Sequence, residues 1–428
     1  MKIFKFGGAS VKDAAAVKNV AGILSSRSSE PLVVVISAMG KTTNALERLT
    51  DAYFKGDQET AQTVLSEIKQ YHHSILEGLF TDKSHPIYNE IHNTFVELEW
   101  VIEDSPAQEY DCEYDQIVSV GELLSTKIVS HYLNFSGIKS RWQDVRDLIK
   151  TDNTYREGKV DWQLTQQCVN EILLPDMQQN QGVPVITQGF LGVTSENFTT
   201  TLGREGSDYT AAILAYCTNA ESVTIWKDVP GVLNADPKWF DNTELIPQLS
   251  YQDAIELTYY GATVIHPKTI KPLQNKNIPL HVRSFVEPDA SGTIIHGEQV
   301  SLPVPCFIFK VDQVLLSIAP KDFSFIVEEN LSTIFRLFSE HGIHLNMMQN
   351  SALRFSAVID NNERRLQNLL DVLRNDFQVL HNDKLELVTI RHYNQATLGR
   401  VTDGKEILLE VKSRYTAQMV MKNRTAGL

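Results

Sequence analysis

The chain has 428 residues, of which 42% are hydrophobic and 21% charged, and its formal net charge is −14. This length predicts two or three domains, and the composition is typical of a globular protein. The negative balance disfavours nucleic acid and anionic membranes as main partners, and no apolar run approaches the roughly 18 residues of a membrane helix.

The chain starts with MKIFKF, which is too short and too charged for a signal peptide. The four cysteines are scattered, without a CxxC pair or the spacing of a metal site. We therefore expect a cytoplasmic protein with reduced cysteines, no membrane segment and no metal site of its own.

Short apolar runs rich in β-branched residues predict strands, and amphipathic stretches between them predict helices. The predicted strands are IFKF, LVVVISAM, VPVITQGFLGV, SVTIWKDV and IPLHV. Their alternation with helices predicts an α/β domain with a doubly wound, mainly parallel sheet over residues 1–290. Residues 58–105 read as inserted helices.

A segment rich in Pro, Gly and Ser at 286–304 predicts a domain boundary. Beyond it, residues 303–428 follow a β-α-β-β-α-β order, which is typical of a ferredoxin-like α+β domain. Two further strands, ILLEVKS and YTAQMVM, are expected near the end.

The stretch KFGGAS ends the first strand and is expected to open a helix near Ser10. Gly7 and Gly8 would let the backbone approach a ligand, and the start of the helix would favour an anion. Lys5 fits such a phosphate site, but it fits equally well a solvated lysine on an edge strand.

A second turn, GREGSDYTAAILAY, contains Arg204, and Ser207 or Asp208 could cap the following helix. If this turn faces KFGGAS, Asp208 would hold Lys5 in position. The loop WKDVPGVLNADPK contains Lys227 and Lys238 and fits a ligand loop at the carboxyl end of a sheet, although most loops between a strand and a helix look similar.

Glu122 lies in the apolar helix VGELLST and needs a cationic partner, which could be an arginine of the protein or a substrate ammonium.

Two common nucleotide-binding motifs are absent from the sequence. GKTT at 40–43 is half a P-loop, because position 35 is a valine, and no GxGxxG occurs.

The ordered segments KFGGAS, VVVISAMGKTTN, VGELLST, TQGFLG, GREGSDYTA, WKDVPGVLNADP and GATVIHPKT resemble the aspartate kinases of the amino-acid kinase family. The resemblance covers about the first 285 residues closely. The remainder is similar to the ACT regulatory region of the same enzymes.

The resemblance implies a role for each matching residue. Lys5 and Asp208 would be catalytic. Aspartate would be held by Ser37, Thr43, Glu122, Arg204, Glu205, Gly206 and Ser207. ATP would be held by Lys5, Phe6, Gly7, Gly8, Ser10, Lys227, Asp228, Leu233, Lys238, Thr263 and Val264.

The implied reaction is phosphorylation of the β-carboxylate of L-aspartate by ATP with Mg²⁺, to give 4-phospho-L-aspartate for lysine, threonine and methionine synthesis. That carboxylate is ionised at neutral pH, so the reaction needs charge stabilisation and positioning rather than a general base.

Three positions depart from the family pattern. Thr263 stands where lysine is usual, Lys227 where a small hydroxyl residue is usual, and Glu205 where glycine is usual. We hypothesise that Lys227 supplies the charge that Thr263 lacks.

The second ACT module appears shortened to the strands around 385–420, which puts feedback inhibition by an amino-acid effector in doubt. A homodimer is expected, because ACT modules commonly associate side by side. The alternatives are a kinase for glutamate or acetylglutamate, and a catalytically weak ACT protein that senses amino acids.

Overall fold

The computed structural model describes residues 1–27, 30–240, 242–262, 265–300, 304–322 and 324–424. By its internal packing the chain divides into two units. The first contains residues 1–232, 247–255 and 264–300, and the second contains 233–246, 256–263 and 301–428. The division at residues 290 and 303 stays a prediction. Among the described residues, no helix is both long and apolar enough to cross a membrane.

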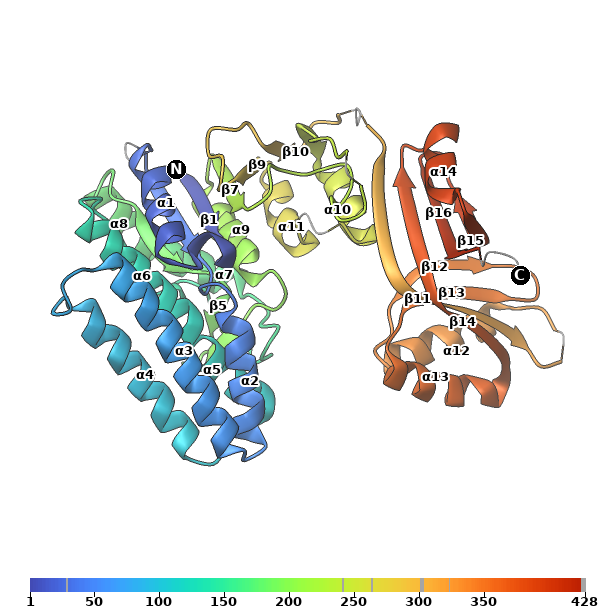
Figure 1. The fold of residues 1–428 in the computed structure, drawn as a ribbon, viewed down its shortest axis with the longest axis horizontal. Helices are drawn as coiled ribbons and strands as arrows, with labels where there is room; N and C mark the ends of the chain where they lie inside the picture. Colours follow the sequence, from blue (N-terminus) through green and yellow to red (C-terminus); the bar gives the residue numbers. More distant parts are fainter. Residues whose placement is uncertain (28–29, 241, 263–264, 301–303, 323, 425–428) are drawn as a thin grey trace. The chain divides into compact units, whose positions relative to one another are not determined.

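The first unit is built around a mainly parallel sheet (Figure 1). Its strands lie in the order β3-β4-β2-β1-β7-β9-β10-β8, and only the β9–β10 pair is antiparallel. The bounds are β1 (Lys2–Phe6), β2 (Leu32–Ile36), β3 (Arg141–Gln143), β4 (Val185–Gln188), β7 (Ser222–Lys227), β8 (Gln248–Ser250), β9 (Leu280–Ser284) and β10 (Thr293–His296). A separate two-stranded sheet pairs β5 (Leu191–Val193) with β6 (Thr199–Thr201). The predicted fold class is confirmed.

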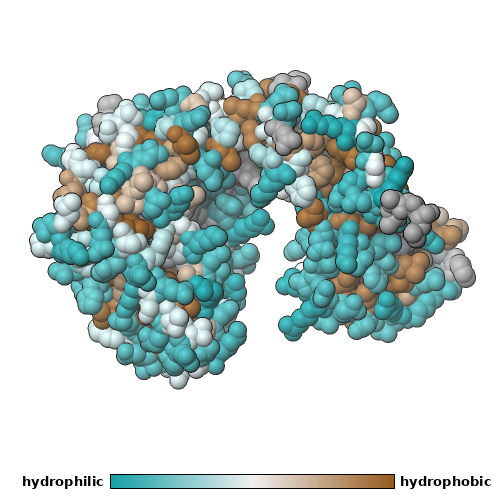
Figure 2. Space-filling view, viewed as in Figure 1, coloured by the Kyte–Doolittle hydropathy of each residue, from teal (hydrophilic) through white to brown (hydrophobic). Residues whose placement is uncertain are grey.

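Helices connect these strands. They are α1 (Ala14–Ser25), α2 (Thr42–Phe54), α3 (Gln58–Leu79), α4 (Ile87–Glu103), α5 (Tyr110–Val118), α6 (Val120–Phe135), α7 (Trp162–Cys168), α8 (Leu174–Gln179), α9 (Gly206–Thr218), α10 (Tyr251–Tyr260) and α11 (Pro267–Asn275). The predicted helical insertion is present as α3 and α4. Both are amphipathic: Leu65, Ile68 and Phe95 pack into the core, whereas the solvent side is mainly hydrophilic (Figure 2).

The central strand β1 separates two different environments. Phe4 and Phe6 lie in the hydrophobic core formed with α1 to α6. Because successive side chains of a strand point to opposite faces, Lys5 faces the other side of the sheet, where α9 packs against β1, β2 and β7. The choice left open by the sequence is thereby resolved: Lys5 lies on a central strand, between Val35 of β2 and Ile225 of β7.

The second unit contains a six-stranded antiparallel sheet in the order β12-β13-β11-β14-β16-β15. Its elements are β11 (Cys306–Pro320), α12 (Glu328–Glu340), β12 (Leu345–Asn350), β13 (Phe355–Asp360), α13 (Glu363–Asp376), β14 (Phe377–Arg391), α14 (Gln395–Thr402), β15 (Lys405–Lys412) and β16 (Thr416–Asn423). The β11-α12-β12-β13-α13-β14 order is the predicted ferredoxin-like module.

The rest of this sheet is formed by the ends of two long strands and by two further strands. Residues 306–310 of β11 pair with the second half of β14, which in turn pairs with β16. The helix α14 was not predicted, and its residues Leu398 and Val401 pack onto this part of the sheet. This part of the sheet therefore carries a helix and a hydrophobic cluster that the pattern of strands alone did not reveal, and the shortened second module stays a prediction.

Candidate functional site

A buried ion pair joins the first strand to the start of α9. Lys5 Nζ lies 2.6 Å from Oδ1 of Asp208, and Lys227 Nζ lies 3.9 Å from Oδ2. Asp208 is fully buried, and burial alone would raise its pKa, but the charges of Lys5 and then of Lys227 outweigh that effect and lower the pKa. Asp208 is thus held as a carboxylate between two ammonium groups, and the two predicted turns do meet.

The aromatic neighbours of Lys5 hold the strand that carries it. Trp226 of β7 stacks on Phe6 at 5.9 Å between ring centroids and meets Phe4 edge-on at 5.7 Å. The Ser10 hydroxyl donates to the Trp226 carbonyl at 3.5 Å. These contacts fix β1 and β7 together, so that Lys5 and Lys227 project on the same side, toward Asp208.

The KFGGAS turn differs from the prediction in one respect. Residues Gly8–Val11 form a short 3-10 helix, and α1 begins only at Ala14, with Asp13 as its N-cap. The helix predicted near Ser10 is therefore displaced toward the C-terminus. Gly8 also has a structural reason to be glycine, because a Cβ there would lie 2.8 Å from the carbonyl oxygens of Ala38 and Gly40.

The GREGSD turn also differs from the prediction. The N-cap of α9 is Glu205, which makes no side-chain cap, and Ser207 and Asp208 lie inside the first turn. The cap predicted at Ser207 or Asp208 is wrong. Glu205 has a φ of 55°, a left-handed conformation that glycine adopts more readily than glutamate.

Glu122, near the start of α6, is only 2% exposed. Its Oε1 accepts the backbone N–H of Ala38 at 3.3 Å, whereas Oε2 is buried without a hydrogen-bond partner. Burial raises the pKa of Glu122 to about 8. No protein cation pairs with Glu122 in the described structure, so its ionised form would need a cationic ligand as its partner.

A cavity of about 860 Å³ brings many of the predicted residues together. Those that line it are Lys5, Ser37, Thr43, Glu122, Arg204, Glu205, Gly206 and Ser207. Other predicted residues lie on the adjoining strands, turns and helix without lining the cavity; they are Phe6, Gly7, Gly8, Ser10, Asp208, Lys227 and Asp228. Leu233 and Lys238 belong to the second unit, and Thr263 and Val264 lie outside the described residues.

The sequence did not reveal Asp115, which organises one wall of this cavity. It is fully buried in α5, and its carboxylate accepts the backbone N–H of Arg156 at 2.8 Å and of Thr201 at 2.9 Å, with the Thr201 hydroxyl at 2.8 Å. Burial, opposed by these bonds, raises its pKa to about 6. Its only sequence signal is an aspartate inside CEYDQIV, at an apolar position of a helix.

The cavity is lined by cationic side chains and also by the buried Glu122. Lys5 and Arg204 can attract anionic groups, and Glu122 can accept an ammonium. Among the described residues, no group of three or more His, Cys, Asp and Glu side chains is placed to hold a metal ion. The site can therefore bind a zwitterion and present a second anion to it.

Comparison with known proteins agrees with this geometry. Residues 1–284 match the model of the amino acid kinase family. The chain is 33% identical over 369 residues to the chloroplastic aspartokinase 1 of Arabidopsis thaliana, and 31% identical over 363 residues to the lysine-sensitive aspartokinase 3 of Escherichia coli. The matches cover 84% of this chain in both cases, and 63% and 78% of the two relatives respectively.

The chain is also similar to solved structures of an aspartokinase. The chain is similar to E. coli aspartokinase III in complex with aspartate and ADP, with a TM-score of 0.82 and 27% identity. It is also similar to that enzyme in complex with lysine and aspartate, with a TM-score of 0.81. Each match covers 98% of this chain, and 96% and 95% of the solved chains respectively.

Proposed function

Since this chain belongs to the amino acid kinase family, and within it to the aspartokinases, we propose that it phosphorylates the β-carboxylate of L-aspartate with MgATP. The product would be 4-phospho-L-aspartate, which enters lysine, threonine and methionine synthesis. The chain spans 63% of the length of the Arabidopsis relative, so the activity of the whole protein is part of the proposal.

One observation carries the proposal: a single cavity is lined by both Lys5 and Glu122, and one carboxylate oxygen of Glu122 is buried without a hydrogen-bond partner in the described structure. Glu122 would take the α-ammonium of aspartate, and Arg204 the α-carboxylate. Ser37, Thr43 and the turn of Glu205, Gly206 and Ser207 would complete the substrate site. The β-carboxylate would then point toward Lys5.

The proposed reaction brings two anions together, the β-carboxylate of aspartate and the triphosphate of ATP. The β-carboxylate is ionised at neutral pH and attacks the γ-phosphorus of ATP, with ADP as the leaving group. Lys5 would stabilise charge on the transferring phosphoryl group, while Asp208 holds the Lys5 ammonium in place. No general base is required, which is consistent with a site that presents lysines and an arginine.

On the nucleotide side, Phe6, Gly7, Gly8 and Ser10 would lie around the phosphates. Lys227 and Asp228 at the end of β7 would contact the nucleotide, and Leu233, Lys238, Thr263 and Val264 complete the proposed set. Lys227 would supply charge that the family obtains from a lysine at position 263. Mg²⁺ would arrive with ATP as part of the substrate.

The second unit would bind an amino-acid effector. Lysine is bound with aspartate in the E. coli aspartokinase III structure described above. We further propose that the protein works as a homodimer in the cytoplasm, with ACT modules associating side by side.

The test is to incubate the protein with MgATP and single amino acids and to trap any acyl phosphate with hydroxylamine. We expect hydroxamate with aspartate and none with glutamate or acetylglutamate, and we expect Lys5→Ala to abolish it. Hydroxamate with glutamate or acetylglutamate alone would show that this acid, and not aspartate, is the substrate. No hydroxamate with any acid would favour an amino-acid sensor.

A further inference from the structure

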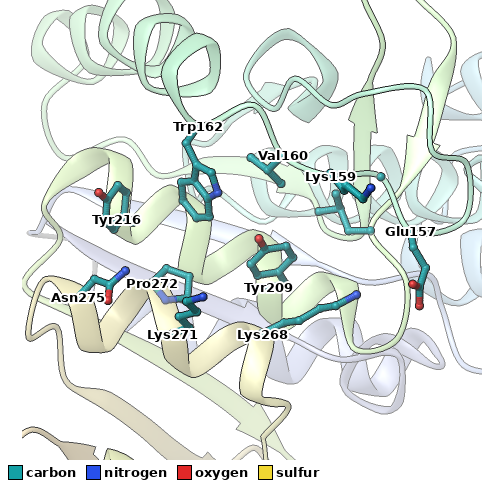
Figure 3. A pocket seen from close by; sticks show the side chains of 12 residues that line it. Glu157, Lys159, Val160, Trp162, Tyr209, Tyr216, Lys268, Lys271, Pro272 and Asn275 are labelled. Atoms are coloured by element: carbon teal, nitrogen blue, oxygen red, sulfur yellow. The ribbon is translucent and has the colours of Figure 1, made fainter. Parts of the chain in front are cut away.

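A second cavity, of about 520 Å³, lies in the first unit against α9 and α11. Figure 3 shows side chains reaching it from α7, from α9, from α11 and from residues 157–160. Among the described residues, Glu157 is the only one that lines both this cavity and the candidate substrate site. The second cavity is therefore a separate feature of the first unit.

Three aromatic rings form its apolar wall. Tyr209 and Tyr216 are seven residues apart, so they lie on the same side of α9. Trp162 meets Tyr216 edge-on at 5.1 Å between centroids and Tyr209 at 6.4 Å. With Val160, Leu202 and Pro272, these rings build a surface suited to a flat apolar group.

Three lysines line the same cavity. Lys159 precedes α7, whereas Lys268 and Lys271 lie on α11, more than 100 residues away in the chain. Within the described part of the chain, none of the three ammonium groups lies within 4.0 Å of a carboxylate. Isolated surface lysines are ordinary. In a chain of net charge −14, however, these three lysines outnumber Glu157, the one carboxylate among the residues that line the cavity, and with the aromatic wall they form a local site complementary to an anion.

We propose that this cavity binds a small organic anion with a planar aromatic ring, such as an aromatic carboxylate or a nucleotide. Its ring would lie against Trp162, Tyr209 and Tyr216, and its anionic group would meet Lys159, Lys268 and Lys271. The volume is within the usual range of small-molecule sites, roughly 300–1,000 Å³. The ligand would contact Tyr209, the residue that follows Asp208 on α9, and so would lie next to the helix turn that holds Lys5.

The binding test uses 8-anilinonaphthalene-1-sulfonate, an aromatic anion whose fluorescence rises in apolar sites, titrated into the full chain. We expect one saturable site whose affinity falls at least about tenfold in K268E/K271E and in Trp162→Ala. The matched control K55E/K139E, which changes two exposed lysines outside the cavity, should bind as the wild type does. Thermal unfolding of each variant checks that it is folded.

Equal affinity in the wild type and K268E/K271E would overturn the proposal, as would release of the probe from this site by aspartate. A displacement series then identifies the source of the anion. Release by 4-hydroxybenzoate supports an aromatic acid, and release by AMP supports a nucleotide. Release by inorganic phosphate alone, or by none of these compounds, would show that the cavity does not recognise a planar organic anion.

Discussion

Glu122 links the proposed substrate to pH. Its pKa is raised to about 8 by burial, so below that pH the free protein holds the carboxyl protonated. Pairing with the α-ammonium of aspartate requires the ionised form, and binding must then release a proton. We expect the KM for aspartate to rise by up to about tenfold per pH unit as the pH falls below 8, with a smaller effect on kcat.

The measurement is the KM for aspartate from about pH 6 to about pH 9, with calorimetry in two buffers of different ionisation enthalpy to count the released proton. Glu122→Gln should bind aspartate weakly and lose this pH dependence. A wild-type KM that stays constant across the range would remove Glu122 from the ammonium site.

The proposed role of Lys227, to supply positive charge on the nucleotide side, can be tested separately from that of Glu122. Its ammonium lies 3.9 Å from Asp208 Oδ2, whereas the closer contact of Lys5 is with Oδ1. If it supplies the nucleotide-side charge, Lys227→Ala should raise the KM for MgATP by roughly tenfold and lower kcat, because phosphate charge is less well stabilised. Steady-state kinetics with the exposed Lys55→Ala as control measures this. Unchanged KM and kcat would refute the compensation.

At the scale of elements, Asp115 ties three segments into one wall of the substrate cavity. It joins α5 to β6 through Thr201 and to the loop of Arg156, and both of these residues line the cavity. Asp115→Asn replaces one acceptor oxygen by a donor that faces other donors. We expect a loss of about 1–3 kcal/mol of stability.

The same substitution should raise the KM for aspartate, because the wall moves, while the KM for MgATP changes little. Denaturant unfolding and steady-state kinetics report the two effects. Thr154→Ala is a suitable control, since Thr154 lines the same cavity and its side chain, among the described residues, bonds only Asp152 in its own exposed turn. If Asp115→Asn and Thr154→Ala had equal kinetics, Asp115 would have no positioning role.

Much of the element order could be predicted from the sequence, because apolar β-branched runs mark buried parallel strands. The differences between the predicted and the observed elements are confined to helix starts and to one short helix. The first helix begins at Ala14, where Asp13 can cap it, rather than at the glycine turn. The α9 turn is entered through a left-handed Glu205, which no residue preference would predict. The short α14 escaped detection, although Asn394 and Thr397 form a capping box before it.

At the scale of the molecule, the sequence predicted the site residues one by one but could not show which of them meet. Whether Lys5 was solvated or buried depended on the strand order, which places β1 between β2 and β7. Asp115 was missed because its partners, Arg156 and Thr201, lie far away in the chain. Long-range pairing of this kind leaves no periodic pattern in the sequence.

His72 makes the stability of the first unit depend on pH. It is fully buried in α3, where its Nδ1 bonds the Ile68 carbonyl at 2.8 Å and its Nε2 has no partner. Burial lowers its pKa from 6.5 to about 4. The unfolded chain therefore binds more protons between these values, so stability is full above pH 6.5 and is lost as the pH falls toward 4.

We expect His72 to contribute up to about 1.4 kcal/mol of lost unfolding free energy per pH unit in that window. Urea unfolding across the window, in wild type and in His72→Leu, measures the contribution as the difference in slope. His73→Leu, at the exposed neighbouring position, is the control. Parallel pH profiles for wild type and His72→Leu would exclude His72 as the cause.

The central claim is that the β-carboxylate of aspartate attacks the γ-phosphorus of ATP in the site built around Lys5 and Asp208. Aspartate labelled with ¹⁸O in its β-carboxylate, incubated with MgATP and the protein, tests it by ³¹P NMR. We predict a new acyl-phosphate resonance with the ¹⁸O isotope shift, because the bridging oxygen comes from aspartate. No acyl phosphate, or one that lacks the isotope shift, would contradict the account.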